Sequence, residues 1–408
     1  MTHPVLRVAM LSMHSSPLAQ AGVGDSGGMN VYVRELSSAL AQAGVDTTTY
    51  VRRWDPGLPD EVAVEPGFRV VHVDAGPPEM SKEELPGVVG EFTAAVGDHL
   101  LRGPGADVLH ANYWLSGMAG HQLKHQLDVP LVCTFHTFAR VKAEGGDLEP
   151  VRRERAELEI IGCADAICVS CSEEERQFRR HHGDPPGRVE IVAPGVEHAF
   201  FAPGDQGGAR WALGLPSDAP VLLFVGRIQP LKGADVAVRT LASLDRPDAL
   251  LAIVGGASGA DGDHEVEKLE VLVDELDVRG QVRFVPPQPH HLLSTYYRAA
   301  DVVLVPSRSE SFGLVALEAA ACGVPVVASA VGGLLTLVDH GHSGFLVPGR
   351  DPDAFAAYTT EILDNGLLAA QMATHGAARA RQYTWSLAAA RLRRVYADVS
   401  ARTLVQCG

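Results

Sequence analysis

Long apolar runs are missing from this sequence of 408 residues. A helix that crosses a membrane needs about 18 or more consecutive apolar residues, and the chain has no such stretch without charges. The start of the chain also lacks the charged region, apolar core and cleavage site of a secretory signal. Residues 5–11 instead enter a strand pattern directly. We therefore expect a cytoplasmic protein with no membrane span.

Positively charged residues are also fewer than negatively charged ones. Lys and Arg number 34 against 50 Asp and Glu, which gives a formal net charge of −16. A nucleic-acid-binding protein needs a clustered positive surface, so this balance argues against nucleic acid as a partner. Phosphorylated small molecules would approach against the average field. Any local cluster of basic residues is therefore informative.

Cysteine is scarce, and most of the cysteines lie within apolar runs. The pair Cys168-x-x-Cys171 has a spacing that could indicate redox or metal chemistry. Neither a second pair nor a nearby group of histidines completes it, so we interpret the two as reduced residues of the core or of a strand end. We expect no metal site. The full set is Cys133, Cys163, Cys168, Cys171, Cys322 and Cys407.

The chain alternates short apolar runs with helical patterns, which predicts parallel, doubly wound sheets. Its length suits two domains of ordinary size. A segment rich in glycine and proline, 194–216, interrupts the alternation. We expect an α/β protein with two Rossmann-like domains, at 1–200 and 201–383, and a final helix within 384–408 that packs back on the first. The expected strands are 5–12, 47–52, 69–74, 107–110, 131–135, 166–170 and 189–193, then 221–225, 250–254, 282–285, 302–305, 324–328 and 344–347.

The chain is organised around residues 307–323. A buried strand ends before them, and a helix is expected to begin near Phe312 and Gly313. The free N–H groups and positive dipole of its first turn can bind a diphosphate. Glu310 precedes the helix, and Glu318 is expected about two turns into it. Carboxylates bind vicinal hydroxyls well, so the pair suggests a nucleotide sugar, although an ordinary surface carboxylate pair is the alternative.

Two further loops follow the carboxyl ends of predicted strands. Arg227 and Lys232 follow the first strand of the second half, where carboxyl ends of parallel strands bind ligands. Their charges can hold a diphosphate, although a solvated basic turn is the alternative. Near the start of the chain, Gly27 and Gly28 allow close approach of the backbone to a ligand, or form a simple flexible turn.

The segment ESFGLVALEA resembles the Glu-x7-Glu motif of the retaining glycosyltransferases of family 4, which have the GT-B fold of two Rossmann-like domains facing a cleft. The resemblance implies a nucleotide-sugar donor, no separate cofactor, and a leaving phosphate that accepts the proton of the acceptor. It implies catalytic roles for His136, Arg227, Lys232 and Glu310, and ribose binding by Glu318. The implied donor-binding set is Gly28, Arg227, Lys232, Glu310, Ser311, Phe312, Gly313, Leu314 and Glu318.

A narrower resemblance extends along nearly the whole chain. The loop at 13–30 and the segments 81–86, 110–117 and 135–137 look like those of the actinobacterial D-inositol-3-phosphate glycosyltransferases, which begin mycothiol synthesis by transferring N-acetylglucosamine from UDP to an inositol phosphate. This resemblance implies UDP-GlcNAc, or UDP-Glc, as the donor, and it allows a homodimer. The acceptor-binding set that it implies is Asn30, Lys82, Tyr113, Thr137 and Arg153.

The sequence departs from that pattern in two places. The stretch 138–142 differs and the loop after it is short, so Arg152 or Arg155 could replace Arg153 as the phosphate ligand. Gln288 stands where an arginine is common beside the base. Three rival functions stay open: synthesis of a sucrose phosphate, glycosyl transfer in specialised metabolism, and epimerisation of a nucleotide sugar, which would need no acceptor phosphate site.

Overall fold

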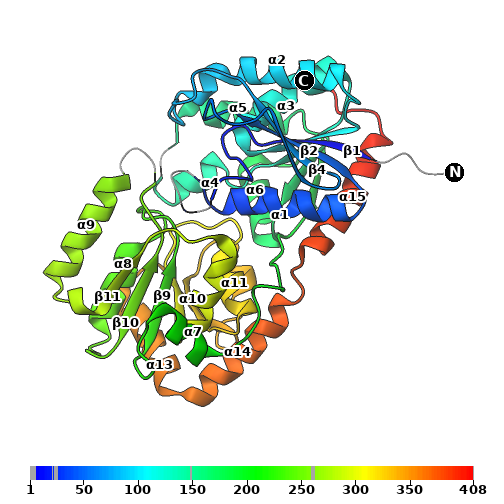
Figure 1. Cartoon of the computed structure of the whole chain (residues 1–408). Helices are drawn as coiled ribbons and strands as arrows, with labels where there is room; N and C mark the ends of the chain where they lie inside the picture. Colours follow the sequence, from blue (N-terminus) through cyan, green and yellow to red (C-terminus); the bar gives the residue numbers. More distant parts are fainter. Residues whose placement is uncertain (1–5, 21, 23–25, 148, 259–261, 408) are drawn as a thin grey trace. The chain divides into compact units, whose positions relative to one another are not determined.

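The computed structural model describes residues 6–20, 22, 26–147, 149–258 and 262–407. The chain forms two compact units. The first comprises Met1–Ala19, Met29–Pro194 and Trp385–Gly408, and the second comprises Gln20–Gly28 and Gly195–Thr384. Figure 1 shows the chain from its blue start to its red end, with the last helix, α15 (Trp385–Ser400), among the elements of the first unit. None of the helices in the described ranges combines the length and the apolar character that crossing a membrane requires.

The first unit is built on a sheet with the strand order β3-β4-β2-β1-β5-β6-β7-β8. Strand β3 runs antiparallel to β4, and the other pairings described in this sheet are parallel. Continuous apolar runs such as that of β7 are typical of strands covered on both faces. The strands are β1 (Arg7–Leu11), β2 (Asp46–Arg52), β3 (Glu61–Glu65), β4 (Phe68–Val73), β5 (Val108–Asn112), β6 (Leu131–Thr134), β7 (Ala166–Val169) and β8 (Arg188–Ile191).

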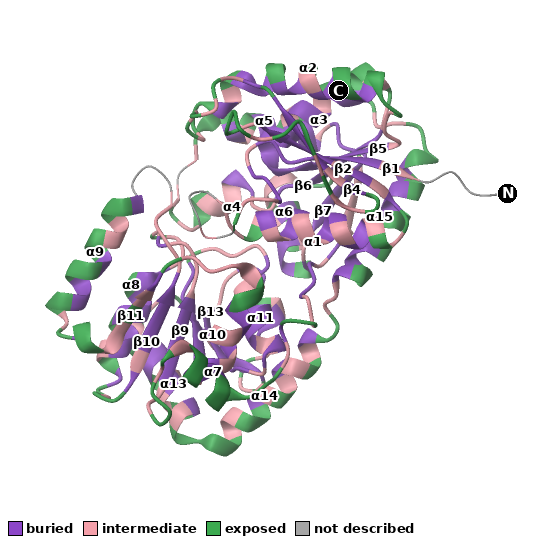
Figure 2. Cartoon of the chain, viewed as in Figure 1, coloured by how far each residue is buried: buried purple, intermediate pink, exposed green. Residues whose placement is uncertain are grey.

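Helices cover both faces of this sheet, and the central strands β5, β6 and β7 are buried (Figure 2). The end strands β3 and β8 are partly exposed. One face packs on α2, α3 and α5 through side chains such as Phe92, Leu123 and Ile160. The other face packs on α1 and α15, where Leu36 and Leu392 belong to one apolar cluster. The helices are α1 (Gly28–Gln42), α2 (Val89–Arg102), α3 (Tyr113–Leu127), α4 (Ala139–Glu144), α5 (Val151–Ile161), α6 (Ser172–His182) and α15.

The second unit has a parallel sheet with the strand order β11-β10-β9-β12-β13-β14. Its strands are β9 (Val221–Val225), β10 (Leu250–Val254), β11 (Val282–Val285), β12 (Val302–Val305), β13 (Val326–Ser329) and β14 (Gly344–Val347). The helices are α7 (Gln206–Leu213), α8 (Ala234–Ser243), α9 (Gly262–Glu275), α10 (Leu293–Ala299), α11 (Leu314–Ala321), α12 (Leu334–Leu337), α13 (Pro352–Asp364) and α14 (Gly366–Ala380).

Each sheet has a point where the strand order reverses direction. In the first unit β1 lies between β2 and β5, and in the second β9 lies between β10 and β12. Ligands of open α/β sheets bind outside the carboxyl ends of the strands at such points. The loops after β1 and β5, and those after β9 and β12, are therefore the places where a site is expected.

The α/β, doubly wound architecture predicted from the sequence is confirmed, and several local features differ. Strand β3 was not predicted, because half-exposed EVAVE carries charge at both ends and forms only an antiparallel edge. Helix α4 was also missed, and the segment 194–216 contains α7. Helix α11 begins at Leu314, so Glu318 lies one turn into the helix and not two.

Candidate active site

Strand β9 delivers Arg227 and Lys232 to the carboxyl edge of the second sheet. Arg227 Nη1 donates a hydrogen bond to Ser258 Oγ over 3.1 Å, which directs the guanidinium toward the loop after β10. Lys232 Nζ lies 2.6 Å from Glu310 Oε2, and both side chains are partly exposed. The two cations predicted to hold a diphosphate therefore both follow β9, and they contact the loops after its two neighbours in the sheet, β10 and β12.

The loop after β12 brings Glu310 and the start of α11 to the same edge. Gly313 occupies the position before the helix with φ at 104°, in the left-handed region that favours glycine. A Cβ at Gly313 would also lie 2.8 Å from Leu334 Cδ2. No side chain caps this helix start in the described structure, so the first N–H groups of α11 are available to an anion.

A second glycine pair, Gly332 and Gly333, which was not predicted from the sequence, supports this loop. Gly333 donates its N–H to the carbonyl oxygen of Glu310 over 2.9 Å. A Cβ at Gly332 would lie 1.9 Å from that oxygen, and a Cβ at Gly333 would lie 2.4 Å from Phe312 Cα. The close approach of backbone to backbone fixes the loop that carries Glu310. A Gly-Gly pair three residues after the end of a buried strand, β13, was the available signal.

Glu318 is buried and has its own partners. Its Oε2 accepts a hydrogen bond from the Tyr297 hydroxyl over 2.8 Å, and its Oε1 lies 2.7 Å from His290 Nε2. The His290 ring in turn lies against that of Phe201, with ring centroids 5.0 Å apart. Glu310 and Glu318 are thus held by different neighbours within the second unit. His290 and Tyr297 were missed because no short motif connects them to the Glu-x7-Glu segment.

The loop of residues 20–28 belongs to the second unit at its described positions. Gln20 Nε2 donates a hydrogen bond to the carbonyl oxygen of Pro287 over 3.0 Å. A Cβ at Gly27 would lie 3.2 Å from Arg227 Nε, and one at Gly28 would lie 3.5 Å from Leu314 Cδ1. The glycine pair therefore allows this loop to approach two of the predicted donor residues. Gln288, where an arginine was expected, donates to the carbonyl oxygen of Pro286.

In the first unit, the predicted acceptor residues converge on the ring of Tyr113. The Arg153 guanidinium carbon lies 4.9 Å from the ring centroid, and Lys82 Nζ lies 5.2 Å from it. Arg153 Nη2 donates to the carbonyl oxygen of Thr137 over 2.8 Å. Tyr113 has φ at 74°, an uncommon conformation for a bulky residue. His14, from the loop after β1, lies against the same ring at 4.5 Å.

Arg153 is held inside a buried set of charges. Its side chain is 1% exposed, its Nε donates to Glu157 Oε1 over 2.7 Å, and its Nη1 lies 3.0 Å from Glu149 Oε1. Burial lowers the pKa of Arg153, but Tyr113 and the two carboxylates raise it more, so the guanidinium stays charged. The two carboxylates were not predicted. They fix the direction of the guanidinium before any ligand binds.

The three alternative arginines have different surroundings. Arg152 donates to the carbonyl oxygen of Glu83, and Arg155 is exposed. Arg153 is the arginine that lies at Tyr113 and Thr137. Asn30, the remaining predicted acceptor residue, is buried and faces the loop after β1. It accepts from Ser15 Oγ and donates to the carbonyl oxygen of Ser16, both over 2.6 Å.

His136 follows β6 and has an uncommon backbone, with φ at 61°. Its Nε2 lies 2.9 Å from Asn112 Oδ1, and its ring meets Tyr32 edge to face at 4.7 Å. Burial lowers the pKa of His136 to about 3. The imidazole is therefore neutral near pH 7, where it can donate a hydrogen bond but not supply a proton as an acid.

The cysteines divide into two groups. Cys168 and Cys171 are buried free thiols, as predicted, and burial raises the pKa of Cys168 to about 12. Cys163 and Cys407 form a disulfide, which was not predicted from the sequence. Two histidines, His121 and His125, lie beside that pair, so the described residues do contain a group of possible metal ligands. It belongs to the other ends of α3 and α5, away from Tyr113 and Arg153.

Comparison with known proteins places this architecture in a defined group. The family described as "Glycosyl transferases group 1" matches residues 205–379, and the "Glycosyl transferase 4-like domain" matches residues 27–195. The D-inositol 3-phosphate glycosyltransferase 2 of Catenulispora acidiphila is 45% identical over 98% of this chain and 95% of the relative.

Two solved structures are also similar. A sucrose-phosphate synthase from Thermosynechococcus elongatus has a TM-score of 0.92 at 34% identity, covering 97% of this chain and 99% of that one. Anabaena HepE, solved in complex with UDP-glucose, has a TM-score of 0.77 at 18% identity, covering 96% and 100%. The second likeness shows the fold alone.

Proposed function

This chain belongs to the family 4 glycosyltransferases, together with the D-inositol 3-phosphate glycosyltransferases, and on this premise we propose that it transfers a hexosyl group from a nucleotide sugar to a phosphorylated polyol. The specific reaction we propose moves N-acetylglucosamine from UDP-GlcNAc to 1D-myo-inositol 3-phosphate with retention of anomeric configuration. One observation carries the acceptor: two cationic side chains meet at Tyr113 in a protein whose net charge is −16.

The cluster of Lys82, Tyr113, Thr137 and Arg153 has the chemistry of a phosphate site. Arg153 already uses Nε, Nη1 and Nη2 in contacts with the protein, and Lys82 is only partly buried. We assign the remaining guanidinium donors, the Lys82 ammonium and the two hydroxyl groups to the phosphate oxygens. The Asn30 amide is assigned to a ring hydroxyl of the acceptor.

The donor diphosphate is assigned to Arg227, Lys232 and the first N–H groups of α11. Lys232 now pairs with Glu310 over 2.6 Å, and a diphosphate would offer its ammonium a second anionic partner. Glu310 would then orient the hydroxyls of the hexose, with the backbone of Ser311, Phe312, Gly313 and Leu314 around it. Glu318, aligned by Tyr297, would receive the ribose hydroxyls. Gly28 would leave room for the diphosphate.

The chemistry in this proposal needs no protein nucleophile. The bond between the anomeric carbon and the diphosphate oxygen breaks, and a bond from that carbon to the acceptor oxygen forms on the same face. The acceptor hydroxyl proton passes to the departing diphosphate. Arg227, Lys232 and the helix N–H groups stabilise the charge that develops on the leaving group. Neutral His136, whose Nε2–H is directed at Asn112 Oδ1, would sit beside the hexose. We propose that this step requires neither a metal ion nor a further cofactor.

A hexose phosphate is the second candidate acceptor. The likeness to a sucrose-phosphate synthase at 34% identity over nearly the whole chain favours it, and the same phosphate-binding residues would serve. Glycosyl transfer in specialised metabolism and nucleotide-sugar epimerisation remain the other rivals. The epimerase alternative has no use for the cationic cluster at Tyr113.

A donor and acceptor screen tests the proposal. UDP- and GDP-linked hexoses would be offered with inositol 3-phosphate, free inositol, fructose 6-phosphate and no acceptor. We expect UDP-GlcNAc with inositol 3-phosphate to give the highest kcat/KM and a product of retained configuration by NMR. Faster use of fructose 6-phosphate would replace the acceptor assignment, and conversion of the donor without any acceptor would support an epimerase.

A further inference from the structure

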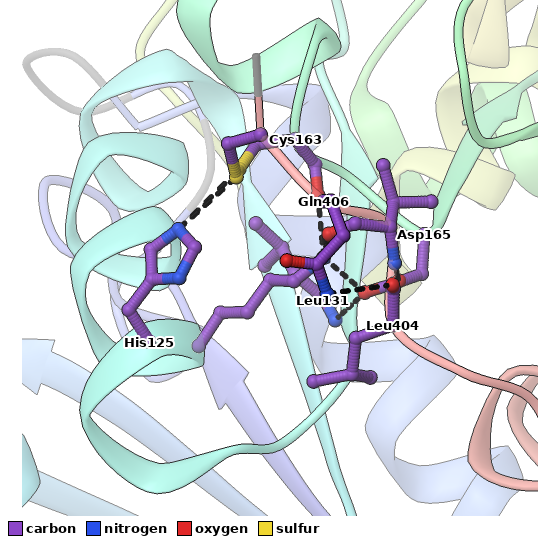
Figure 3. The surroundings of a disulfide bond; sticks show 9 residues. His125, Leu131, Cys163, Asp165, Leu404 and Gln406 are labelled. Carbon is purple, nitrogen blue, oxygen red and sulfur yellow. Dashed lines mark hydrogen bonds and ion pairs between the residues drawn. A yellow bond between two sulfur atoms is a disulfide. The ribbon is translucent and has the colours of Figure 1, made fainter.

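Four possible metal ligands from separate parts of the first unit meet near the ends of α3 and α5. They are His121, His125, Cys163 and Cys407, and their ligand atoms all lie within 4.8 Å of one another. His125 Nε2 lies 3.4 Å from Cys163 Sγ and 3.1 Å from Cys407 Sγ. Figure 3 shows the His125 ring directed at the Cys163 sulfur. In the structure the two cysteines are joined as a disulfide, with Cα atoms 4.8 Å apart.

The fold positions each of these donors separately. His121 and His125 are one turn apart on α3, so they share a face, and their ring centroids are 5.2 Å apart. Cys163 follows the end of α5, where its N–H donates to the carbonyl oxygen of Ile160 over 3.1 Å. Cys407 comes from the tail after α15, 244 residues farther along the chain. The site can therefore form only when the tail lies across the first unit.

A buried ion pair holds the tail in that place. Lys124 Nζ lies 2.9 Å from Asp165 Oδ2, and both side chains are almost fully buried. Val405 donates its N–H to the other oxygen of Asp165 over 2.7 Å and accepts from Lys124 Nζ over 3.0 Å. Leu131 also donates its N–H to Asp165. Cys407 lies two residues after Val405, whose backbone is held by these hydrogen bonds, so the fold restrains the position of the Cys407 sulfur.

The chemistry of the set favours a metal ion of the zinc class. Two thiolates and two imidazoles are a common zinc ligand set, and His-x3-His is a common spacing for the histidine pair. Tetrahedral zinc with bonds of about 2.0–2.3 Å places its ligand atoms roughly 3.3–3.8 Å apart, which small side-chain movements would reach from the present arrangement. A disulfide alone would need neither histidine. Moreover, Cys133, Cys168, Cys171 and Cys322 are free thiols.

We infer that, with both cysteines reduced, His121, His125, Cys163 and Cys407 form a binding site for a divalent zinc-class metal ion that fastens the C-terminal tail to α3 and α5. All four positions of a tetrahedral ion would be filled by the protein, which is typical of a structural site. Metal binding and the disulfide exclude each other, because the disulfide removes both thiolates. The inference does not depend on the proposed function.

A metal ion at this place would not contact the predicted acceptor residues, but it would be connected to them through α3 and α5. Tyr113 begins α3 and Arg153 lies in the first turn of α5, whereas the metal ligands lie at the other ends of these helices. The helices pack closely between the two places, since a Cβ at Gly117 would lie 2.8 Å from Ile160 Cδ1. An ion joining α3, the end of α5 and the tail would therefore restrain the helix pair that presents Tyr113 and Arg153.

The test uses the full chain, reduced with a phosphine, stripped with a chelator and titrated with Co²⁺ as a spectroscopic substitute for Zn²⁺. We expect one equivalent to bind, with thiolate-to-cobalt charge-transfer absorption and the visible bands of tetrahedral cobalt, and Zn²⁺ to displace it. Cys407→Ser and His125→Gln should each weaken binding about 100-fold or more, since even the loss of a residue that only hydrogen-bonds a metal ligand costs 10–100-fold.

Cys171→Ser is the matched control. It makes the same chemical change in the same unit, and serine can keep the cap that Cys171 Sγ provides to Glu174 N. Its cobalt affinity should equal that of the wild type. Cys407→Ser changes only the tail, so it should fold, and limited proteolysis should then remove the tail faster than in the zinc-loaded wild type. Failure of the reduced protein to bind metal, or equal affinity in Cys407→Ser, would overturn the inference and leave the disulfide as the function of this pair.

Discussion

The Lys232 ammonium lies 2.6 Å from a carboxylate oxygen of Glu310, so the residue predicted to bind the donor diphosphate and the residue predicted to orient the hexose form an ion pair. Both are partly exposed, at 26% and 18% of the side chain, so the pair can open to a ligand at modest cost. The contact also holds the Lys232 ammonium beside the loop that carries Glu310. It makes each residue a positioning partner for the other before binding.

Replacing Lys232 tests its role toward the leaving group. Lys232→Ala should lower kcat by about 100-fold or more at saturating donor, because it removes one preorganised cation. The KM for the acceptor should change far less. Steady-state kinetics with both substrates varied would measure this. Lys268→Ala, an exposed lysine of the same unit paired with Glu265, should leave both constants unchanged. A near-normal kcat in Lys232→Ala would contradict the assignment.

Replacing Glu318 tests the ribose contact. Glu318→Ala should weaken binding of UDP by roughly 1–3 kcal/mol, the value of a charge-assisted hydrogen bond. Calorimetry with UDP alone measures this without any acceptor. Tyr297→Phe is a useful companion, because it removes only the hydroxyl that holds Glu318 Oε2. It should weaken UDP binding less than Glu318→Ala does. Unchanged affinity in Glu318→Ala would remove the residue from the donor site.

The acceptor phosphate can be tested through Lys82, which is less buried than Arg153. Lys82→Ala should reduce kcat/KM for inositol 3-phosphate by about 10-fold or more and leave the slow use of free inositol unchanged. Arg152→Ala, at a neighbouring exposed arginine, is the control and should behave as wild type toward both acceptors. Equal use of the two acceptors by the wild type would show that the cluster at Tyr113 does not bind phosphate.

Arg153 calls for a separate experiment, because its replacement leaves two carboxylates behind. Arg153→Ala should abolish the preference for the phosphorylated acceptor and also destabilise the first unit by about 3–5 kcal/mol, since Glu157 would be buried without its partner. The double variant Arg153→Met with Glu157→Leu should recover stability without recovering the acceptor preference. Recovery of both would mean that Arg153 acts only through the fold.

The buried histidines predict how stability depends on pH. Burial lowers the pKa of His110 to about 3, well below its ordinary value of about 6.5. The unfolded chain therefore binds protons between about pH 6.5 and 3 that the native protein does not. The free energy of unfolding should fall as pH falls through this window, by up to about 1.4 kcal/mol per pH unit for each such histidine.

Urea unfolding at pH 7 and pH 5 checks this for His110, which contacts Tyr396 and Thr134. In a Trp211→Phe background the remaining tryptophans, Trp54, Trp114 and Trp385, all belong to the first unit. There, His110→Gln should be less stable at pH 7 but show a smaller loss between the two pH values. His342→Gln, at an exposed histidine, should leave the pH dependence unchanged. An identical dependence in His110→Gln would show that His110 does titrate in the native state.

Much of the architecture followed from local patterns. Apolar runs of four or five residues, such as those of β7 and β9, predicted buried strands because parallel strands are covered on both faces. The start of α11 at Gly313 and Leu314 was predicted from the glycine and the apolar pattern beyond it. Strand β3 was not predicted because half-exposed edge strands carry charged residues, which weakens the apolar pattern that marks a strand.

The sequence by itself determined the α/β class, the family and the loops that carry the candidate donor and acceptor residues, because strand period, glycine positions and short motifs are all local properties. Only the tertiary structure decided which groups meet: Lys232 with Glu310, Glu318 with Tyr297 and His290, Arg153 with Glu157 beneath Tyr113, and His121 with Cys407. Apart from the one-turn spacing of Arg153 and Glu157, these partners are far apart in the chain. Their contacts depend on strand order and helix packing, which cannot be predicted from the spacing of residues along the sequence.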